Sequence, residues 1–241
     1  MPAFNEESTI AAIVSAVLAS PFTAELIIVD DASTDSTPEI VAAMSDPRIR
    51  YLRQGVNQGK GAAIQRGFSE AAHPYLIIQD ADLEYDPADY GKIAALLLSG
   101  KADVVFGSRF LSDQGRRVLY YWHAVANRFL TTLSNMFTNL NLTDMETCYK
   151  AFRKEVVQSF EFKEARFGIE PELTAKIARG GWIVYEVGIS YSGRTYAEGK
   201  KIGWRDGIRA IYCIILYSDI GPPLRLRRVE PLVRWVTHSR A

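Results

Sequence analysis

Residues 75–87 read YLIIQDADLEYDP and place three carboxylates, Asp80, Asp82 and Glu84, directly after a short apolar run. Such a run, bounded by turn-forming residues, is typical of a buried strand, so the acids are expected at its carboxyl end. Hard cations such as Mg²⁺ or Mn²⁺ prefer oxygen ligands, and they complete their shell with phosphate oxygens and water. The stretch therefore predicts a divalent-cation site, with these three acids as ligands, and a nucleoside-diphosphate substrate.

The alternative is that these acids only cap the next helix. Asp86 followed by Pro87 is typical of a helix amino terminus. Capping explains Asp86 but leaves the three earlier carboxylates without a role, so the metal site is the favoured interpretation.

Short apolar runs alternate with helical patterns around this stretch. Strands are expected at 25–29, 49–52, 75–79 and 102–106, and helices at 8–19, 37–44, 62–72 and 88–98. This alternation is typical of βαβ units and predicts an α/β fold with a mostly parallel sheet flanked by helices. Such a fold would have a first strand where this chain begins. Either a few residues upstream of Met1 are missing, which we expect, or the sheet lacks that strand.

The composition is that of a globular protein. The 241 residues are 48% hydrophobic and 23% charged, which excludes a disordered chain and suits a single sizeable core. No apolar run reaches the roughly 18 to 20 residues of a membrane span, and the start carries no secretory signal pattern. The two cysteines, Cys148 and Cys213, lack metal-type spacing, so a reducing cytoplasm is expected.

Charge is distributed unevenly along the chain. Residues 1–100 hold 14 acidic and 6 basic side chains, a net charge of −8, whereas residues 194–241 hold 4 acidic and 10 basic ones, a net charge of +6. The basic end could contact anionic lipid or phosphate. Apolar residues recur with a helical period over 118–137, and a second apolar run covers 208–217. We predict a globular domain over 1–206 and a membrane-interfacial tail over 207–241. The alternative for 118–137 is an ordinary helix packed on the sheet.

Six motifs occur in a fixed order: MPAFNEE, IIVDDASTDST, NQGKGAAIQRGF, QDADLEYDP, VFGSRF and GRTYAEGKK. In this the chain resembles inverting family-two glycosyltransferases of the GT-A fold, in particular the branch with dolichol-phosphate mannose synthase and bacterial polyprenyl-phosphate sugar synthases. The resemblance implies a Rossmann-like GT-A domain with amphipathic C-terminal helices. It also implies transfer of a sugar from a GDP-mannose or UDP-glucose type donor to polyprenyl or dolichyl phosphate. The enzyme would use Mg²⁺ or Mn²⁺, work peripherally at the cytoplasmic membrane surface and need no nucleic acid.

The resemblance also assigns roles to residues. Those implied around the donor nucleotide are Pro2, Phe4, Glu6, Val29, Asp30, Asp31, Lys60, Asp80, Ala81 and Lys200, with Asp30 supporting its turn. Those implied in catalysis are Asp82, Arg109, Arg194 and Lys201. The metal ion on Asp82 and the three basic side chains would neutralise the leaving diphosphate. Glu84 stands where glutamine is frequent, and Lys200 where serine is common. On the acceptor side the candidates are Asp144, Glu146 and Lys150, and Glu170 is expected either to face the sugar or to favour the helix dipole.

The acceptor decides whether a catalytic base is needed. A phosphomonoester has a second pKa of about 6, so it is largely deprotonated at neutral pH and needs no strong base. Transfer to a glycan or lipid hydroxyl is the main alternative and would need one, for which Asp144 is the candidate. A noncatalytic membrane-associated module that binds nucleotide sugars would not need paired carboxylates. A sugar-phosphate nucleotidyltransferase is disfavoured because PAFNEES lacks a loop rich in glycine and arginine.

Overall fold

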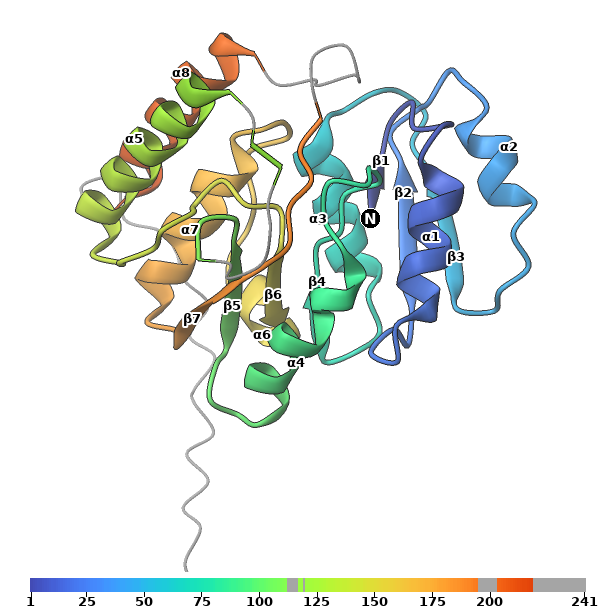
Figure 1. Ribbon diagram of the computed structural model, residues 1–241, viewed down its shortest axis with the longest axis horizontal. Helices are drawn as coiled ribbons and strands as arrows, with labels where there is room; N and C mark the ends of the chain where they lie inside the picture. Colours follow the sequence, from blue (N-terminus) through green and yellow to red (C-terminus); the bar gives the residue numbers. More distant parts are fainter. Residues whose placement is uncertain (112–116, 119, 195–202, 219–241) are drawn as a thin grey trace, which may run out of the picture.

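The computed structural model describes residues 1–111, 117–118, 120–194 and 203–218, and it confirms the predicted α/β class (Figure 1). The strands are β1 (Pro2–Ala3), β2 (Leu26–Asp30), β3 (Ile49–Arg53), β4 (Tyr75–Ile77), β5 (Val104–Ser108), β6 (Lys150–Arg153) and β7 (Val184–Gly188). The helices are α1 (Ile10–Ala19), α2 (Thr37–Ala42), α3 (Lys60–Glu70), α4 (Tyr90–Leu98), α5 (Tyr121–Thr138), α6 (Lys154–Gln158), α7 (Ile169–Gly180) and α8 (Trp204–Tyr217), with a 3₁₀ turn η1 (Pro87–Asp89) before α4.

The strands form two sheets. Sheet A has the order β1-β2-β3 and is parallel throughout. Sheet B has the order β4-β6-β5-β7, in which β5 and β7 are parallel while β6 runs antiparallel to both of its neighbours. The predicted mostly parallel arrangement therefore holds for sheet A, and β6 makes sheet B mixed. β1 is present, but it has only two residues and pairs with Val29 and Asp30 of β2.

Local sequence explains the elements around the carboxylate stretch. β2 and β5 are buried along their whole length, as expected for strands covered on both faces. The predicted cap at Asp86 is confirmed, because its Oδ1 accepts a hydrogen bond from the Ala88 N–H at 2.9 Å. The three acids before it therefore lie in the loop between β4 and η1, beyond the strand's carboxyl end.

Helices α5 and α8 lie side by side at one end of the molecule (Figure 1) and also pack against α7. α8 begins at Trp204, so the predicted domain boundary after residue 206 falls inside a helix. Its inward face buries Ala210, Cys213, Ile214 and Tyr217. Residues 219–241 of the predicted tail lie outside the described residues. Among the helices that the structure describes, none combines the length and the apolar character needed to cross a bilayer.

Candidate active site

The candidate residues gather beyond the carboxyl ends of the strands. Pro2 lies in β1, and Glu6 follows in the loop to α1; Asp30 ends β2; Asp82 follows β4; and Arg109 follows β5. In open α/β sheets this edge is where ligands bind. The structure therefore brings together groups that are up to 188 positions apart in the sequence, as between Glu6 and Arg194.

Arg194 joins three carboxylates. Its Nη2 donates to Asp82 Oδ2 at 2.7 Å, and its two terminal nitrogens each donate to Glu6 at 3.2 Å. Its backbone N–H donates to Glu84 Oε1 at 2.6 Å. Glu84 is held further by the Tyr191 hydroxyl, which donates to Oε2 at 3.0 Å. Arg194, the first basic residue of the GRTYAEGKK motif, thus contacts two of the acids that the sequence predicts for the metal, Asp82 and Glu84.

The charge balance around Asp82 suits a cation. Burial, followed by the neighbouring Asp80 and Glu84, raises the pKa of Asp82 to about 7, while Arg194 opposes this rise. A carboxyl with so high a pKa sits in a surplus of negative charge, which a divalent cation would offset. Oxygen donors of this kind fit Mg²⁺ or Mn²⁺. Asp82 and Glu84 are therefore suitable ligands.

Asp80 is already paired. The Lys60 ammonium lies 2.9 Å from Asp80 Oδ1 and 3.5 Å from Glu170 Oε1. Burial opposes the charged form of Lys60, but Asp80 and Glu170 raise its pKa well above the usual value. In the described part of the chain no three acids, histidines or cysteines converge as a metal cluster. The predicted trio of Asp80, Asp82 and Glu84 is consequently not preassembled.

A buried chain of charges runs from the donor side to the acceptor side. Glu170 Oε2 accepts from the Lys150 ammonium at 2.7 Å, and Lys150 also donates to the Thr147 carbonyl. The order is Asp80, Lys60, Glu170, Lys150, and the Lys150 side chain is fully buried. Lys150 was predicted to position the acceptor, but its ammonium is committed to this network.

Two acids predicted near the nucleotide, Asp30 and Asp31, accept hydrogen bonds from the protein itself. Asp31 accepts from the N–H groups of Gln58 and Gly59, both at 2.7 Å, and so holds the glycine-rich loop. Asp30 supports its turn as expected, because it accepts from the Ser33 N–H and the Tyr51 hydroxyl. These oxygens are occupied by the protein itself, which makes turn support the first role of both acids.

The glycine-rich loop packs closely against residues 164–165. A Cβ at Gly59 would lie 2.5 Å from the Ala165 carbonyl oxygen, and one at Gly61 would lie 2.3 Å from that of Glu164. Gly59 also has a φ of 100°, which favours glycine. Residues 164–165 therefore fill the space directly beside these two glycines.

Two further predicted contacts lie in the core. The Val29 side chain is buried and clusters with Ala63 of α3. Ala81 is buried in the main core cluster. Their side chains are therefore unavailable to a nucleotide, and only their backbone could face one. Phe4 is half-buried in the loop after β1, and Lys200 and Lys201 lie outside the described residues.

On the acceptor side, Arg109 and Asp144 form a bidentate ion pair. Arg109 Nε lies 2.6 Å from Asp144 Oδ2, and Nη2 lies 2.7 Å from Oδ1. Asn127 of α5 also donates to Oδ1 at 3.0 Å. Burial alone would raise the pKa of Asp144, but Arg109 lowers it overall. A fully paired carboxylate with a lowered pKa is a poor general base, which argues against the base role considered for Asp144.

Glu146 is the group that the sequence analysis undervalued. Burial, followed by the nearby Glu170, raises the pKa of Glu146 to about 7. Its Oε1 is buried and accepts no hydrogen bond within the described residues. A pKa near neutrality is what a general base requires. The only sequence signal for it was the spacing of two acids, Asp144 and Glu146, ahead of a buried strand.

Unsatisfied polar atoms gather around these groups. Buried polar atoms normally have partners, so those without one call for an explanation such as an absent ligand. Within the described residues the buried side-chain atoms without a hydrogen bond include Glu146 Oε1, Thr147 Oγ1, Glu170 Oε1 and Arg194 Nε. All four belong to the side chains just described or adjoin them in the chain. These atoms are therefore candidates to bind a polar ligand.

Comparison with known proteins agrees with this geometry. A crystal structure of glucosyl-3-phosphoglycerate synthase from Mycobacterium tuberculosis, in complex with Mn²⁺, UDP and phosphoglyceric acid, has the same fold. The TM-score is 0.70 at 19% identity, over 92% of this chain and 78% of that one. The fold is that of the GT-A class.

The chain belongs to glycosyl transferase family 2, whose family model matches residues 1–160. It is 25% identical over 212 residues to polyprenol monophosphomannose synthase of Mycolicibacterium smegmatis, covering 84% of this chain and 80% of that protein. It is also 25% identical over 215 residues to undecaprenyl-phosphate mannosyltransferase of Micrococcus luteus, covering 84% and 86%. The chain is therefore a glycosyltransferase, as the sequence predicted.

Proposed function

We propose that this glycosyltransferase moves a sugar from a nucleoside-diphosphate sugar, of the GDP-mannose or UDP-glucose type, to a polyprenyl phosphate. The names of the two relatives from Mycolicibacterium and Micrococcus support a lipid-phosphate acceptor. The observation that carries the proposal is the contact of Arg194 with Asp82 at the carboxyl edge of the strands. The contact supports the proposal because a guanidinium beside a carboxylate suited to a metal ion would stabilise a leaving diphosphate.

The leaving group needs charge neutralisation. A divalent cation held by Asp82 and Glu84 would act as a Lewis acid on the diphosphate oxygens. Arg194 adds a fixed positive charge beside it, and its planar guanidinium suits phosphate oxygens. Such preorganised charge is worth most where charge develops in the transition state. Inversion at the anomeric carbon follows from a single displacement by the acceptor.

The acceptor side favours a nucleophile that is already ionised. Asp144 is occupied by Arg109 and has a lowered pKa, so it is unsuited to take a proton. A lipid phosphate, with a second pKa of about 6, needs no such base. The Arg109 side chain is 18% exposed beside this ion pair, and we infer that it contacts the second phosphate.

The test is a transfer assay with radiolabelled GDP-mannose and UDP-glucose, polyprenyl phosphate and Mn²⁺. Asp82→Asn should reduce transfer to the background level while the unfolding temperature stays close to that of the parent. The matched control is Asp46→Asn, because Asp46 pairs with Arg48 on the surface at the other end of the sheet. Transfer by Asp82→Asn at the rate of the Asp46→Asn control would contradict the proposal.

A second candidate, transfer to a sugar or lipid hydroxyl, is favoured by one observation. Glu146 supplies a buried carboxyl with a pKa of about 7 on the acceptor side. A hydroxyl nucleophile would need such a base. In that case Glu146, rather than Asp144, would be the base.

We also propose that the α5–α8 face contacts a membrane surface, which would place the enzyme peripherally at the cytoplasmic side. Helix α5 buries its polar face and exposes its apolar face, which is the reverse of a helix packed on a sheet. Its buried residues are Thr131, Ser134 and Thr138, and its exposed apolar residues are Tyr121, Trp122, Val125, Phe129 and Met136. On α8 the exposed apolar residues are Ile208, Tyr212 and Ile215.

The inversion has a physical reason. The polar side of α5 holds the acceptor loop, since Thr131 accepts from the Met145 N–H and Asn135 is hydrogen-bonded to Leu142. The apolar stripe is left outward, with Trp122 75% and Met136 76% exposed. Aromatic and apolar side chains on one face of a helix are typical of interfacial helices.

Liposome co-sedimentation tests this face. Trp122→Ser combined with Met136→Ser should lower binding to anionic vesicles at least severalfold. The control combines Val56→Ser with Ile183→Ser, because these side chains are similarly exposed on other elements. Equal sedimentation of both double variants would contradict the proposal.

A further inference from the structure

Tyr191 contacts a charged group on each side of the candidate active site. Its hydroxyl donates to Glu84 Oε2 at 3.0 Å, and the central carbon of the Arg109 guanidinium lies 5.1 Å from the centre of its ring. Glu84 is one of the acids suited to a metal ion, whereas Arg109 lies on the acceptor side. Tyr191 itself follows β7 and is half-buried. A single side chain therefore links the two halves of the site.

The backbone fixes Tyr191 beside Glu84. Tyr191 forms an antiparallel bridge with Tyr85, the residue after Glu84. The neighbouring Ser192 N–H donates to the Glu84 carbonyl at 2.9 Å. These contacts already pair the segment after β7 with the loop that carries the acids. The Tyr191 hydroxyl is therefore not needed to connect the two segments, and its bond to Glu84 acts on the orientation of the carboxylate.

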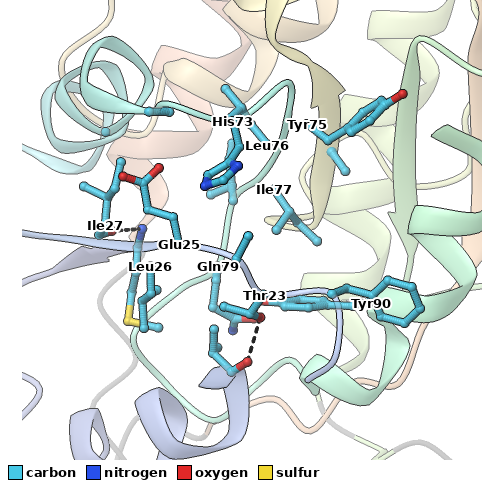
Figure 2. A pocket seen from close by; sticks show the side chains of 18 of the residues that line it. Thr23, Glu25, Leu26, Ile27, His73, Tyr75, Leu76, Ile77, Gln79 and Tyr90 are labelled. Atoms are coloured by element: carbon cyan, nitrogen blue, oxygen red, sulfur yellow. Dashed lines mark hydrogen bonds between the residues drawn. The ribbon is translucent and has the colours of Figure 1, made fainter. Parts of the chain in front are cut away.

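A column of aromatic rings supports Tyr191 from the core. Its ring centre lies 5.4 Å from that of Tyr85, which stacks on Tyr149 at 4.8 Å. Tyr149 packs against Tyr90 at 5.8 Å, and both of these hydroxyls donate to Gln79 Oε1. Figure 2 shows Tyr90 and Gln79, the far end of this column, in the wall of an apolar pocket. Because Tyr85, Tyr149 and Tyr90 are buried, the Tyr191 ring rests on a close-packed base.

The hydroxyl leaves Glu84 able to bind a cation. An ionised carboxylate has about four lone-pair sites, and the Tyr191 hydroxyl uses one of them on Oε2. Hydrogen bonds to a ligating carboxylate orient it, and their loss typically weakens metal binding about 10- to 100-fold. The phenol is neutral, unlike the guanidinium of Arg194. Tyr191 therefore orients Glu84 without competing with the metal ion for its charge.

The ring acts on Arg109 from a different direction than Asp144 does. Asp144 binds two nitrogens at the edge of the guanidinium, at 2.6 and 2.7 Å. An aromatic ring attracts a cation over its face within about 6 Å, most strongly where water is excluded. The Tyr191 ring is nearer to Arg109 than the Phe110 ring, whose centre lies 6.0 Å away. Asp144 and Tyr191 together fix both the position and the tilt of the guanidinium.

We propose that Tyr191 is a positioning residue of this glycosyltransferase, whose hydroxyl orients Glu84 toward the metal ion and whose ring holds Arg109 at the acceptor phosphate. The side chain thereby sets the separation between the two phosphate-bearing substrates. This inference rests on the proposed function for the identity of the two ligands. Tyr191 acts through Glu84 and Arg109, so its hydroxyl and its ring have separable effects.

Two variants separate the hydroxyl from the ring. Tyr191→Phe removes the hydroxyl and keeps the ring, whereas Tyr191→Leu removes both. Titration calorimetry measures Mn²⁺ binding to the nucleotide-free chain and, with a chelator present, binding of geranyl phosphate. Tyr191→Phe should raise the Mn²⁺ dissociation constant about 10- to 100-fold and leave that of geranyl phosphate within about twofold. Tyr191→Leu should weaken Mn²⁺ binding equally and also weaken geranyl phosphate binding by about threefold or more.

Tyr185 supplies the matched controls, because it lies on β7 six positions earlier and is 41% exposed. Tyr185→Phe and Tyr185→Leu should change neither affinity. Mn²⁺ binding by Tyr191→Phe as tight as that of the parent would overturn the proposal. Equal geranyl phosphate affinity in the two Tyr191 variants would also overturn it, as would loss of both affinities in Tyr191→Phe. Failure of the proposed function would appear in the parent instead, as the absence of saturable geranyl phosphate binding, and would overturn both.

Discussion

Arg194 Nη2 lies 2.7 Å from Asp82 Oδ2, and this contact links the segment after β7 to the loop after β4. Arg194 is 19% exposed and Asp82 12% exposed at the side chain, so the pair is well shielded from water. The positive charge of the guanidinium thus offsets part of the excess negative charge that a divalent cation would otherwise neutralise. The metal ion and Arg194 are expected to compete for Asp82 before the nucleotide sugar binds. Once it is bound, both are expected to contact its diphosphate.

This competition predicts opposite effects of Arg194→Ala on two measurements. Mn²⁺ should bind the nucleotide-free variant more tightly, because the competing guanidinium is gone. Transfer should be at least 10²-fold slower, because a fixed charge at the leaving group is lost. Titration calorimetry and the transfer assay give the two values. Arg48→Ala, which breaks a surface pair with Asp46, is the control and should change neither. Weaker Mn²⁺ binding by Arg194→Ala would contradict the competition.

Asp82 makes cation binding dependent on pH. The carboxylate must be deprotonated to bind a cation, and its pKa is about 7. Mn²⁺ affinity should therefore fall by up to about tenfold for each pH unit below 7 and level off above it. Asp82→Asn should remove most of this dependence. A flat affinity between pH 5.5 and about 7 in the parent would show that Asp82 is not a ligand.

The same pKa affects stability in the absence of metal. The folded-state pKa of Asp82 lies above the unfolded value of 3.8, so the folded state binds the proton more tightly. This contribution to stability is fully present below about pH 4 and is lost as the pH rises through about 7. With a chelator present, urea unfolding of the parent minus that of Asp82→Asn should show this loss between pH 4 and about 7. An increase in the difference over that range would contradict the assignment.

Much of the donor edge could be predicted from the sequence, because its signals are local. The apolar run 75–78 and the acids after it indicated a strand end, and Asp86 with Pro87 indicated the helix start. The role of Asp31 could not be predicted, since its partners Gln58 and Gly59 approach only after β2 and α3 have packed. The burial of the Val29 side chain could not be predicted either, because β2 is buried on both faces and so shows no alternation that marks an open side.

The acceptor side and α5 were harder to predict for a related reason. Periodicity shows that a helix has two faces, but it does not say which face the protein covers. The structure covers the polar face of α5, because Asn127 and Thr131 hold the loop of Asp144 and Met145. Likewise the raised pKa of Glu146 depends on Glu170, which lies 24 positions further along the chain.

The buried charges between the two sides should be important for stability. Glu170→Gln removes the counter-charge of Lys150, whose side chain is fully buried. Leaving a buried charge without its partner costs about 3 to 5 kcal/mol, so urea unfolding should show a loss of that size. Glu70→Gln is the control, because Glu70 pairs with the more exposed Arg50 and Arg66 and should cost less than about 1 kcal/mol. Equal losses in both variants would contradict the proposed network.

Glu146→Gln separates the two acceptor classes. If the nucleophile is a lipid phosphate, the variant should keep its rate within about tenfold and retain the shape of its pH profile. If the nucleophile is a hydroxyl, loss of the base should cost about 10²- to 10⁴-fold. The rise in rate around pH 7 should then also disappear, because Glu146 has a pKa of about 7. Rates of the variant and the parent between pH 5.5 and about 8.5 decide between them.

The central claim is that the acceptor is a polyprenyl phosphate, and the product's linkage tests it most directly. The enzyme is incubated with a labelled nucleoside-diphosphate sugar, Mn²⁺ and polyprenyl phosphate, and the lipid product is extracted and treated with mild acid. A sugar joined through phosphate is released under these conditions, whereas one joined to a hydroxyl is not. We predict a labelled lipid that forms only when polyprenyl phosphate is added and that releases its sugar in mild acid. An acid-stable labelled lipid, or label transferred equally well to dephosphorylated polyprenol, would contradict the account.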